Sequence, residues 1–241
     1  MKLKASLHVH TAEDPSDGSL IDYDARCLID LATKNNFKIL AITCHNYFAW
    51  TKELADYAKQ KNILLLKGIE LELREGRRRP HVVVLNCQKD IVKIKTLNQL
   101  RRYKQKHPQI FILGAHPNSD SFFSLGLVSL KKNLDIFDGI EHTWFYSKYF
   151  NTNRPVEKLA EENNKPIIAT ADLHDKKYLN GDYTIIESKQ LTQSSVVEAL
   201  KAGQVKNFSS PKDFWSMFSF LLKFLVFKSC LCYHYNRKKR L

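Results

Sequence analysis

Short apolar runs alternate with helix-like stretches over the first 210 residues, and this alternation restricts the chain to a few architectures. The apolar runs typical of strands are 3–9, 39–43, 63–66, 81–85, 110–113, 136–140, 167–170 and 183–186. Helical spacing is found between them, at 21–35, 51–61, 91–106, 156–163 and 194–201. This alternation predicts an α/β fold with a largely parallel sheet, either closed as a barrel or open.

The composition changes after Ser209-Ser210-Pro211, so we predict a main domain over 1–208 and an appended segment over 209–241. The stretch 214–227 is aromatic and apolar with one lysine, and Arg237-Lys238-Lys239-Arg240 follows it. At 14 residues it is short for a membrane span, which needs about 20. We predict a hydrophobic and basic C-terminal helix over 214–240. It either makes peripheral contact with a membrane or packs on the main domain or another subunit.

The charge balance favours anionic partners. Lys and Arg number 38 against 25 Asp and Glu, a net charge of +13. Phosphate-bearing substrates, nucleic acid and acidic lipids all suit such a chain, and the charge does not choose among them. Five cysteines without framework spacing and the absence of an apolar stretch before His8 predict a cytoplasmic protein without a signal peptide. Any membrane contact would then be peripheral, at the inner face.

Histidines and carboxylates gather where the predicted strands end. His8 and His10 are two residues apart, so on a strand they share one face, and Asp172 and His174 repeat this spacing. His45, Glu70 and His116 follow three other apolar runs, and His81 begins one. His107 lies in a loop, His142 beside a strand end and His234 in the tail, so we leave these three out of the site.

Strand ends of such a fold converge on one mouth, where active sites lie. A mixed set of imidazoles and carboxylates suits Zn, Mn or Fe. The number of candidates predicts two or three divalent ions, which would clamp a phosphate oxygen and a bridging hydroxide. A single histidine at a strand end is more often structural, and the prediction rests on the whole set.

An ordered series of motifs resembles the PHP (polymerase and histidinol phosphatase) family of metal-dependent phosphoesterases. The motifs are Leu7-His8-Val9-His10-Thr11, Ser16-Asp17-Gly18, Ile42-Thr43-Cys44-His45-Asn46, Gly68-Ile69-Glu70, Ala115-His116-Pro117 and Ala171-Asp172-Leu173-His174. The resemblance covers about residues 3–208. It implies a distorted (β/α)7 TIM-like barrel with a two- or three-metal centre.

The resemblance also implies roles for these residues. One metal would be held by His8, His10, Glu70 and Asp172, a second by Glu70, His81 and His116, and a third by Asp17, His45 and His174. Glu70 would then bridge two ions. The chain has Cys44 where the family usually has Asp; strand alternation points this side chain away from His45, and a thiolate ligand is the alternative.

This set predicts an enzyme that hydrolyses a phosphoester of a small molecule or nucleotide with a metal-bound hydroxide. Glu70 and His174 are the candidate catalytic residues, and His174 or a metal-bound water would protonate the leaving group. Arg79 and Asn46 are candidate substrate contacts, although the run Arg77-Arg78-Arg79 is also typical of a solvated hairpin tip.

Two alternatives stay open. The first is an exonuclease or oligonucleotidase, and the second is a non-catalytic, metal-stabilised binding module at a membrane. The sequence does not fix the substrate, the metals or the oligomeric state.

Overall fold

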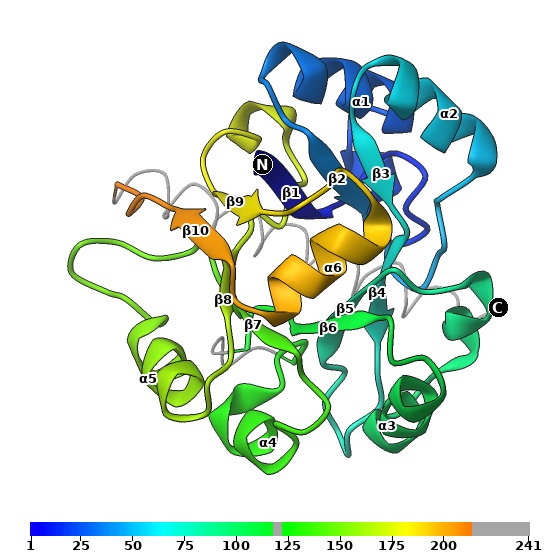
Figure 1. Cartoon of the computed structure of the whole chain (residues 1–241). Coiled ribbons are helices and arrows are strands. Elements are labelled where there is room, and N and C mark those ends of the chain that lie inside the picture. The colour runs from blue at the N-terminus through cyan, green and yellow to red at the C-terminus, as the bar shows by residue number, and fades with distance from the viewer. Residues whose placement is uncertain (118–121, 214–241) are drawn as a thin grey trace, which may run out of the picture. The chain divides into compact units, whose positions relative to one another are not determined.

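A computed structural model describes residues 1–117 and 122–213 (Figure 1), so the predicted tail helix lies outside the described residues. The described residues divide into two units: 1–117 and 122–144 with 152–210, and 145–151 with 211–213. Within the second unit, the N–H of Lys212 donates to the carbonyl of Tyr146 at 2.8 Å. None of the described helices is long and apolar enough to cross a membrane.

The strands of the first unit form two sheets of five. The first has the order β10-β9-β1-β2-β3 and the second the order β4-β5-β6-β7-β8. The strands are β1 (Lys2–Val9), β2 (Ile39–Ile42), β3 (Leu64–Leu66), β4 (Gly68–Glu72), β5 (His81–Leu85), β6 (Phe111–Gly114), β7 (Gly139–His142), β8 (Ile167–Ala169), β9 (Tyr183–Glu187) and β10 (Val205–Phe208).

The prediction of an α/β fold is confirmed, but the described strands form two mixed sheets instead of a largely parallel sheet or the distorted (β/α)7 TIM-like barrel that the resemblance implied. The pairs β1–β2, β2–β3, β6–β7 and β7–β8 are parallel, whereas β1–β9, β9–β10, β4–β5 and β5–β6 are antiparallel. In the second sheet, the charged segment after β4 is the reason why β4 and β5 pair antiparallel. Its turn, closed by backbone hydrogen bonds between Glu75 and Arg78, folds β5 back against β4.

The side-chain amide of Asn207 joins β10 of the first sheet to β8 of the second. Its Nδ2 donates to the carbonyl of Ile167 at 2.8 Å, and its Oδ1 accepts from the N–H of Ala169 at 2.9 Å. Thr184 of β9 donates to the same oxygen. The amide therefore provides hydrogen-bond partners for a carbonyl and an N–H of β8, as the peptide group of a neighbouring strand would. Two isolated bridges, Val9 with Leu173 and His45 with Glu70, also connect the sheets.

Side-chain caps set where several helices begin. Asp24, Thr51, Thr96 and Thr192 each accept a hydrogen bond from the first turn, and such caps contribute about 1 kcal/mol each. The Asp24 cap explains why the first helix starts at Ala25 and not at residue 21 as predicted. The α-helices are α1 (Ala25–Lys34), α2 (Lys52–Gln60), α3 (Leu97–Lys106), α4 (Gly126–Lys132), α5 (Arg154–Glu162) and α6 (Gln193–Lys201), with 3₁₀ turns η1 (Gly18–Leu20), η2 (Lys89–Lys93) and η3 (Lys176–Tyr178).

Three apolar clusters hold the two sheets and the helices together. One joins the first sheet to α1 and α2, and another joins the second sheet to α3, α4 and α5. The third fills the space between the sheets and includes residues of α6, which crosses the middle of Figure 1. Burial of such apolar surface contributes about 25 cal/mol per Å².

A register shift in β1 separates its core part from its histidines. Leu3, Ala5 and Leu7 belong to the cluster between the sheets, but Val9 belongs to the α1–α2 cluster. The pairing of β1 with β2 is irregular between Ser6 and Val9. In a regular strand these four alternating side chains would share one face. They do not, because the shift re-aims the strand just where the histidines begin.

Candidate metal centre

All nine predicted ligands lie together, and the carboxylate of Glu70 is at their centre. Its Oε2 is 3.2 Å from Nε2 of His8, 3.2 Å from Nε2 of His10 and 3.0 Å from Nε2 of His45. Its Oε1 is 3.0 Å from Nδ1 of His81 and 3.5 Å from Nε2 of His116. Five histidines from four segments of the chain therefore face one carboxylate group, which is 1% exposed.

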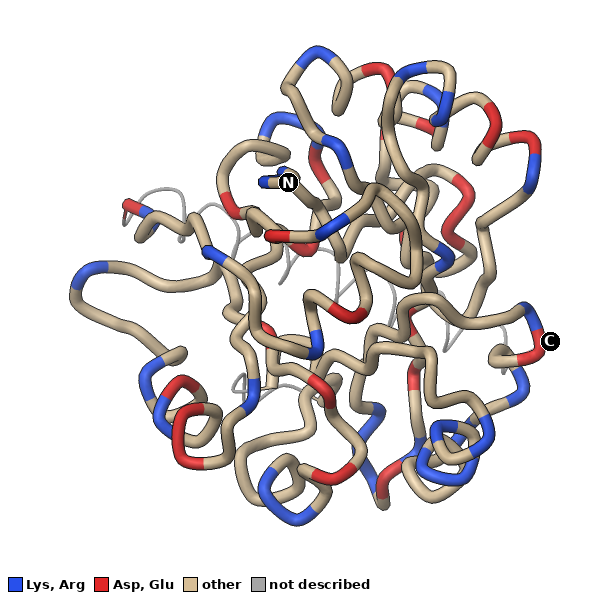
Figure 2. The backbone as a smooth tube through the Cα atoms, in the orientation of Figure 1, with Lys and Arg blue, Asp and Glu red and all other residues tan. Residues whose placement is uncertain are grey.

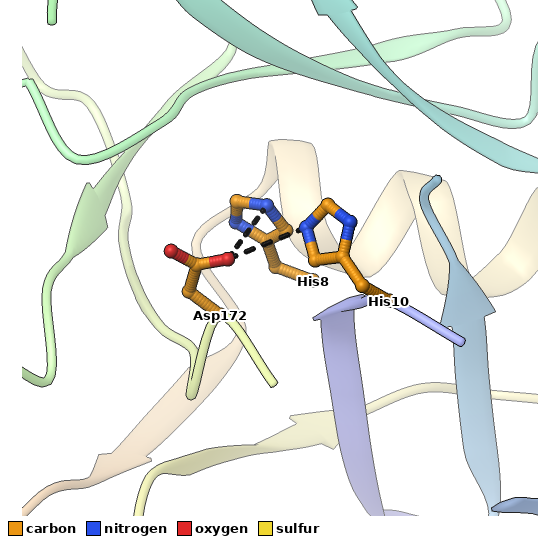
Figure 3. Close-up of side chains that lie close together, drawn as sticks. All are labelled: His8, His10 and Asp172. Carbon is orange, nitrogen blue, oxygen red and sulfur yellow. Dashed lines mark ion pairs between the residues drawn. The ribbon is translucent and has the colours of Figure 1, made fainter. Parts of the chain in front are cut away.

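Asp172 closes the cluster from the other side. Its Oδ1 lies 3.4 Å from Nε2 of His8 and 3.3 Å from Nε2 of His10, so one oxygen faces both rings (Figure 3). Nδ1 of His174 is 2.9 Å from the carbonyl oxygen of Asp172. Because a carbonyl only accepts, this nitrogen of His174 carries the hydrogen and its Nε2 faces the third acidic candidate, Asp17, at 3.1 Å.

Gly18 lets the loop with Asp17 reach this position. A Cβ atom on Gly18 would clash with the carbonyl oxygen of Ala12, which is backbone and has no room to give. The backbone N–H of Asp17 also donates to Oδ1 of Asp14 at 3.2 Å. In the Ser-Asp-Gly motif, the glycine is therefore required by packing, and the aspartate is a candidate ligand.

Two buried carboxylates that the sequence analysis missed orient the histidines. Oδ2 of Asp14 accepts from Nδ1 of His10 at 2.7 Å, from Nδ1 of His45 at 3.0 Å and from the N–H of His45 at 2.8 Å. Glu141 does the same for His8, with Oε1 2.7 Å from Nδ1. A ring whose Nδ1 donates outward keeps its Nε2 lone pair for the centre.

Glu141 also ties together three segments that carry ligands. It accepts from the N–H of His116 and from the hydroxyl of Thr170, besides the ring of His8. The available signals in the sequence were the spacing of Asp14, four residues after His10, and the place of Glu141 at a strand end. Nε2 of its neighbour His142, which is outside the predicted site, lies 3.4 Å from Oε1 of Glu157 in α5.

In the metal centre, burial and the neighbouring charges shift the pKa values of the side chains in opposite directions. Burial opposes protonation of His10, but the carboxylates of Asp14, Asp172 and Glu70 outweigh it and raise the pKa of this ring to about 9. Burial likewise opposes the charge on His45, yet Glu70 and Asp14 raise its pKa to about 11. For Glu70 itself burial favours the neutral form, and the surrounding histidines nevertheless hold its pKa well below the usual range. The cluster therefore favours ionised carboxylates and positive counter-charges.

The residues present fit divalent cations. Nε2 of His8, Nε2 of His10, Nε2 of His81 and both oxygens of Glu70 are buried and make no hydrogen bond to any described residue. Such groups cost free energy unless a partner satisfies them. Three sets have ligand atoms within 4.8 Å of one another: His8, His10 and Asp172; His10, Asp14 and His45; and His45, Glu70 and His81. Imidazole with carboxylate suits Zn, Mn or Fe.

Backbone strain is concentrated among the same residues. His116 has φ of 26° and Asp172 has φ of 43°, in the left-handed region that non-glycine residues seldom adopt. Each such residue costs about 1–3 kcal/mol and persists where the surroundings hold it in place. This strain is typical of functional sites.

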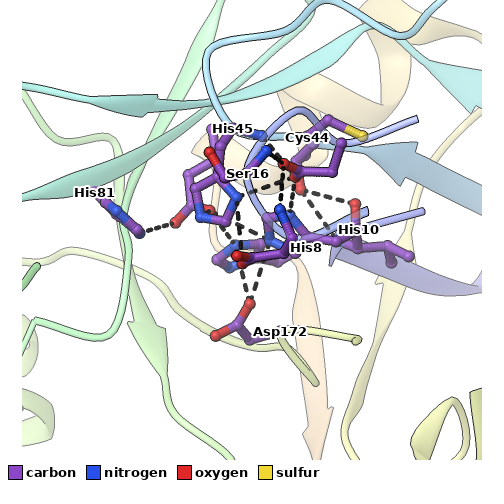
Figure 4. Close-up of polar contacts among 12 residues, drawn as sticks. His8, His10, Ser16, Cys44, His45, His81 and Asp172 are labelled. Atoms are coloured by element: carbon purple, nitrogen blue, oxygen red, sulfur yellow. Dashed lines mark hydrogen bonds and ion pairs between the residues drawn. The ribbon is translucent and has the colours of Figure 1, made fainter. Parts of the chain in front are cut away.

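Cys44 is outside the cluster of donor atoms. Its thiol points away from the histidines (Figure 4), and Sγ lies 3.6 Å from the hydroxyl of Thr11. Burial raises the pKa of the Cys44 thiol to about 11, so a thiolate ligand is disfavoured at neutral pH. The side chain packs in the α1–α2 cluster, as strand alternation predicts.

The two predicted substrate contacts have different surroundings. Asn46 follows His45, but its Oδ1 accepts from the N–H of Glu72 at 3.2 Å, so its amide is engaged with β4. Arg79 lies two residues before His81, and its Nη1 donates to the carbonyl of Arg78 at 3.0 Å.

The fold and the cluster define a class: an α/β protein that brings histidines and carboxylates from several strand ends into one buried group able to hold metal ions. No protein-family model matches the sequence, and no curated protein sequence matches it. Solved structures do match its fold.

A two-domain protein from Bacteroides vulgatus, described as containing a predicted PHP-like metal-dependent phosphoesterase, superposes with a TM-score of 0.65 at 18% identity. The match covers 87% of this chain and 65% of that one. PsfC from Pseudomonas syringae matches with a TM-score of 0.60 at 15% identity, over 95% and 99% of the two chains. The lesion-specific endonuclease EndoQ from Pyrococcus furiosus matches with 0.59 at 13% identity, over 86% and 58%.

The chain thus has the fold of the PHP-like metal-dependent phosphoesterases, and the resemblance carried by the motifs is confirmed at the level of the fold. It spans less than two thirds of the Bacteroides and Pyrococcus chains.

Proposed function

We propose that this protein is a metal-dependent phosphoesterase. The observation that supports it most is the carboxylate of Glu70, which is buried among five histidines with both oxygens lacking a hydrogen bond to any described residue. A buried group of this kind needs a cation. His8, His10, Glu70 and Asp172 would hold one ion, Glu70, His81 and His116 a second, and Asp17, His45 and His174 a third.

Divalent ions bound there would supply Lewis-acid activation of water and of the phosphoryl oxygens. In the hydrolysis, the oxygen of water bonds to phosphorus and releases one proton to solvent, the bond from phosphorus to the leaving oxygen breaks, and that oxygen takes up one proton. His174 has a side chain that is 39% exposed, while the rings of His8 and His10 are fully buried, so it would donate this proton when its Nε2 does not hold the third ion. When the third ion is held there, a water molecule of the site would donate the proton instead. Arg79 would hold a phosphate oxygen with its guanidinium group.

Asp14 and Glu141 have a different part in this proposal. They hold the rings of His10, His45 and His8 so that the Nε2 atoms stay aimed at Glu70 and Asp172. Neither carboxylate needs to touch the substrate. Such outer partners preserve the geometry that the reaction requires.

Elemental analysis of protein purified without added metal, followed by a panel of phosphoesters with Mn²⁺, tests the proposal. We expect bound transition metal and metal-dependent turnover of at least one phosphoester, both lost in His8→Ala. A folded protein without metal and without activity on the whole panel would favour a non-catalytic binding module.

A further inference from the structure

The β4–β5 hairpin, η2 and α3 carry an unusual excess of positive charge. Residues 74–107 contain eleven Lys and Arg but two acidic residues, in a chain whose net charge is +13. Several of the Lys and Arg segments of Figure 2 lie on α3. We call the exposed Lys and Arg side chains of residues 74–106 the basic surface.

The acidic groups around this surface are largely engaged already. Asp90 accepts a hydrogen bond from the hydroxyl of Tyr103 at 2.9 Å. The two acidic residues that follow α4, Asp135 and Asp138, pair with Arg101 at 2.6 Å and with Lys104 at 2.8 Å. Other cations of the surface have no ion pair with any residue in 1–117 or 122–213, namely Arg74, Arg77, Lys93, Lys95, Arg102 and Lys106. Their positive field is therefore available to a partner.

The other helical side of the first unit is different. There Arg26 pairs with Glu53, Lys52 with Asp56 and Lys61 with Asp30, on and between α1 and α2. Within 1–117 and 122–213, the excess positive charge is thus concentrated on the hairpin–α3 side.

The basic surface ends beside the metal centre. β5 begins with the candidate ligand His81, whose N–H donates to the carbonyl of Phe123 at 2.9 Å, and the N–H of Arg79 donates to Phe122 at the same distance. The guanidinium of Arg79 lies 5.9 Å from the ring centroid of Phe122, which is 50% exposed. A half-exposed aromatic ring and a guanidinium group therefore flank the ligand at the hairpin end of the surface.

From these observations we propose that the basic surface binds single-stranded nucleic acid and leads it to the metal centre, with Phe122 as a stacking platform for a base. This rests on the proposed function, because a phosphodiester of the strand would be the bond that is hydrolysed. A row of cations that ends beside an exposed aromatic ring suits a single strand, since phosphates meet the cations and a base of any kind can stack on the ring. A membrane fits less well: the exposed large apolar side chains among the described residues do not include one within 74–106.

Fluorescence anisotropy with a labelled single-stranded DNA of about 20 nucleotides tests this, using the full chain in EDTA so that turnover plays no part. The test variant is Arg102→Glu with Lys106→Glu on α3. The matched control is Lys34→Glu with Lys59→Glu on α1 and α2, which changes the net charge equally. We expect an affinity loss of about tenfold for the test pair and less than about twofold for the control, with a shallower salt dependence for the test pair alone.

Equal losses in the two pairs would overturn the proposal, since binding would then follow overall charge. Failure of the chain to bind DNA, with binding to anionic phosphatidylserine vesicles that the test pair weakens, would overturn it in favour of a lipid surface. Turnover of an aryl phosphate with Mn²⁺, measured on the same preparation, reports the proposed function separately. Selective DNA binding without any turnover would support the surface and contradict the hydrolase.

Discussion

Nδ1 of His8 lies 2.7 Å from Oε1 of Glu141, and this contact determines which ring nitrogen of His8 faces the metal centre. A carboxylate only accepts, so Nδ1 carries the hydrogen and Nε2 keeps its lone pair toward Glu70. We expect Glu141→Gln to lower metal affinity about 10–100-fold. Calorimetric titration with Zn²⁺ or Mn²⁺ measures this, with the exposed Glu161→Gln as matched control. Equal affinities of the two variants would contradict the orienting role.

Replacement of the central carboxylate should have a larger effect. Glu70→Gln removes the negative charge that five histidines share, so we expect loss of bound metal and a fall in turnover of more than about 100-fold. Far-UV circular dichroism should change little. Near-normal turnover in this variant, with Glu161→Gln as reference, would show that Glu70 does not bridge the ions.

Metal removal should destabilise the protein. An ion that binds the native state and not the unfolded chain contributes about 2.7 kcal/mol at a concentration one hundred times its Kd. We expect chelation to lower the Tm and added Mn²⁺ or Zn²⁺ to restore it. The measurement is thermal unfolding with and without chelator, and a Tm that is insensitive to both treatments would count against a resident metal.

Metal binding should release protons. The pKa of His10 is about 9 and that of His45 about 11, so both rings are protonated at pH 7 without metal. A cation needs the free lone pair, so its affinity should rise between pH 6 and pH 8. Titration at pH 7 in two buffers of different ionisation enthalpy detects the release, and identical heats in both would refute it.

The same groups affect the stability of the metal-free protein. The pKa values of His10 and His45 both lie above the ordinary value of 6.5. The stability that their protonated rings contribute to the folded protein is therefore complete below pH 6.5, and it is lost as pH rises through about 9 for His10 and about 11 for His45. The depressed pKa of Glu70 acts oppositely, since its stabilisation is lost as pH falls below the ordinary carboxyl range. Urea unfolding without metal should therefore show the cost of His10→Gln shrinking between pH 6 and pH 10.

The amide of Asn207 should contribute to stability through the contact between the two sheets. Asn207→Asp removes the donor to the carbonyl of Ile167 and places a second oxygen there, at a cost of about 1–3 kcal/mol. Urea unfolding measures it. Asn62→Asp, an exposed position with φ of 57° that Asp also tolerates, is the control. Similar free energies of unfolding for both variants would show that Asn207 does not connect the sheets.

The candidate site could be predicted largely because most of its ligands lie at an end of a short apolar run. His45, His116 and Asp172 follow such runs and His81 begins one, and the family resemblance then supplied the rest of the set. Asp14 follows no apolar run, and Glu141 follows the run 136–140, but neither position distinguishes a carboxylate that orients a histidine from one that is merely nearby. Their roles appear only when the chain folds and brings His10 and His8 against them.

The fold was harder to predict where packing overrides local pattern. The sequence analysis predicts a strand over 136–140, but β7 begins at Gly139. Ile136 and Phe137 are instead buried in the cluster that joins the second sheet to α3, α4 and α5. The strand β10 was missed because its side chains are mostly exposed and it lies at a sheet edge. α4 was missed because seven residues give too few periods to recognise.

The irregular register in β1 divides one strand into two parts with separate duties. Before it, Leu3 and Ala5 pack in the cluster between the sheets, whereas His8 lies within it and His10 after it, with their rings held by Glu141 and Asp14. Volume-conserving substitutions at Leu3 or Ala5 can then accumulate over evolutionary time without rotating the rings of His8 or His10. A deletion of one residue within the irregularity would instead turn both rings out of the centre at once.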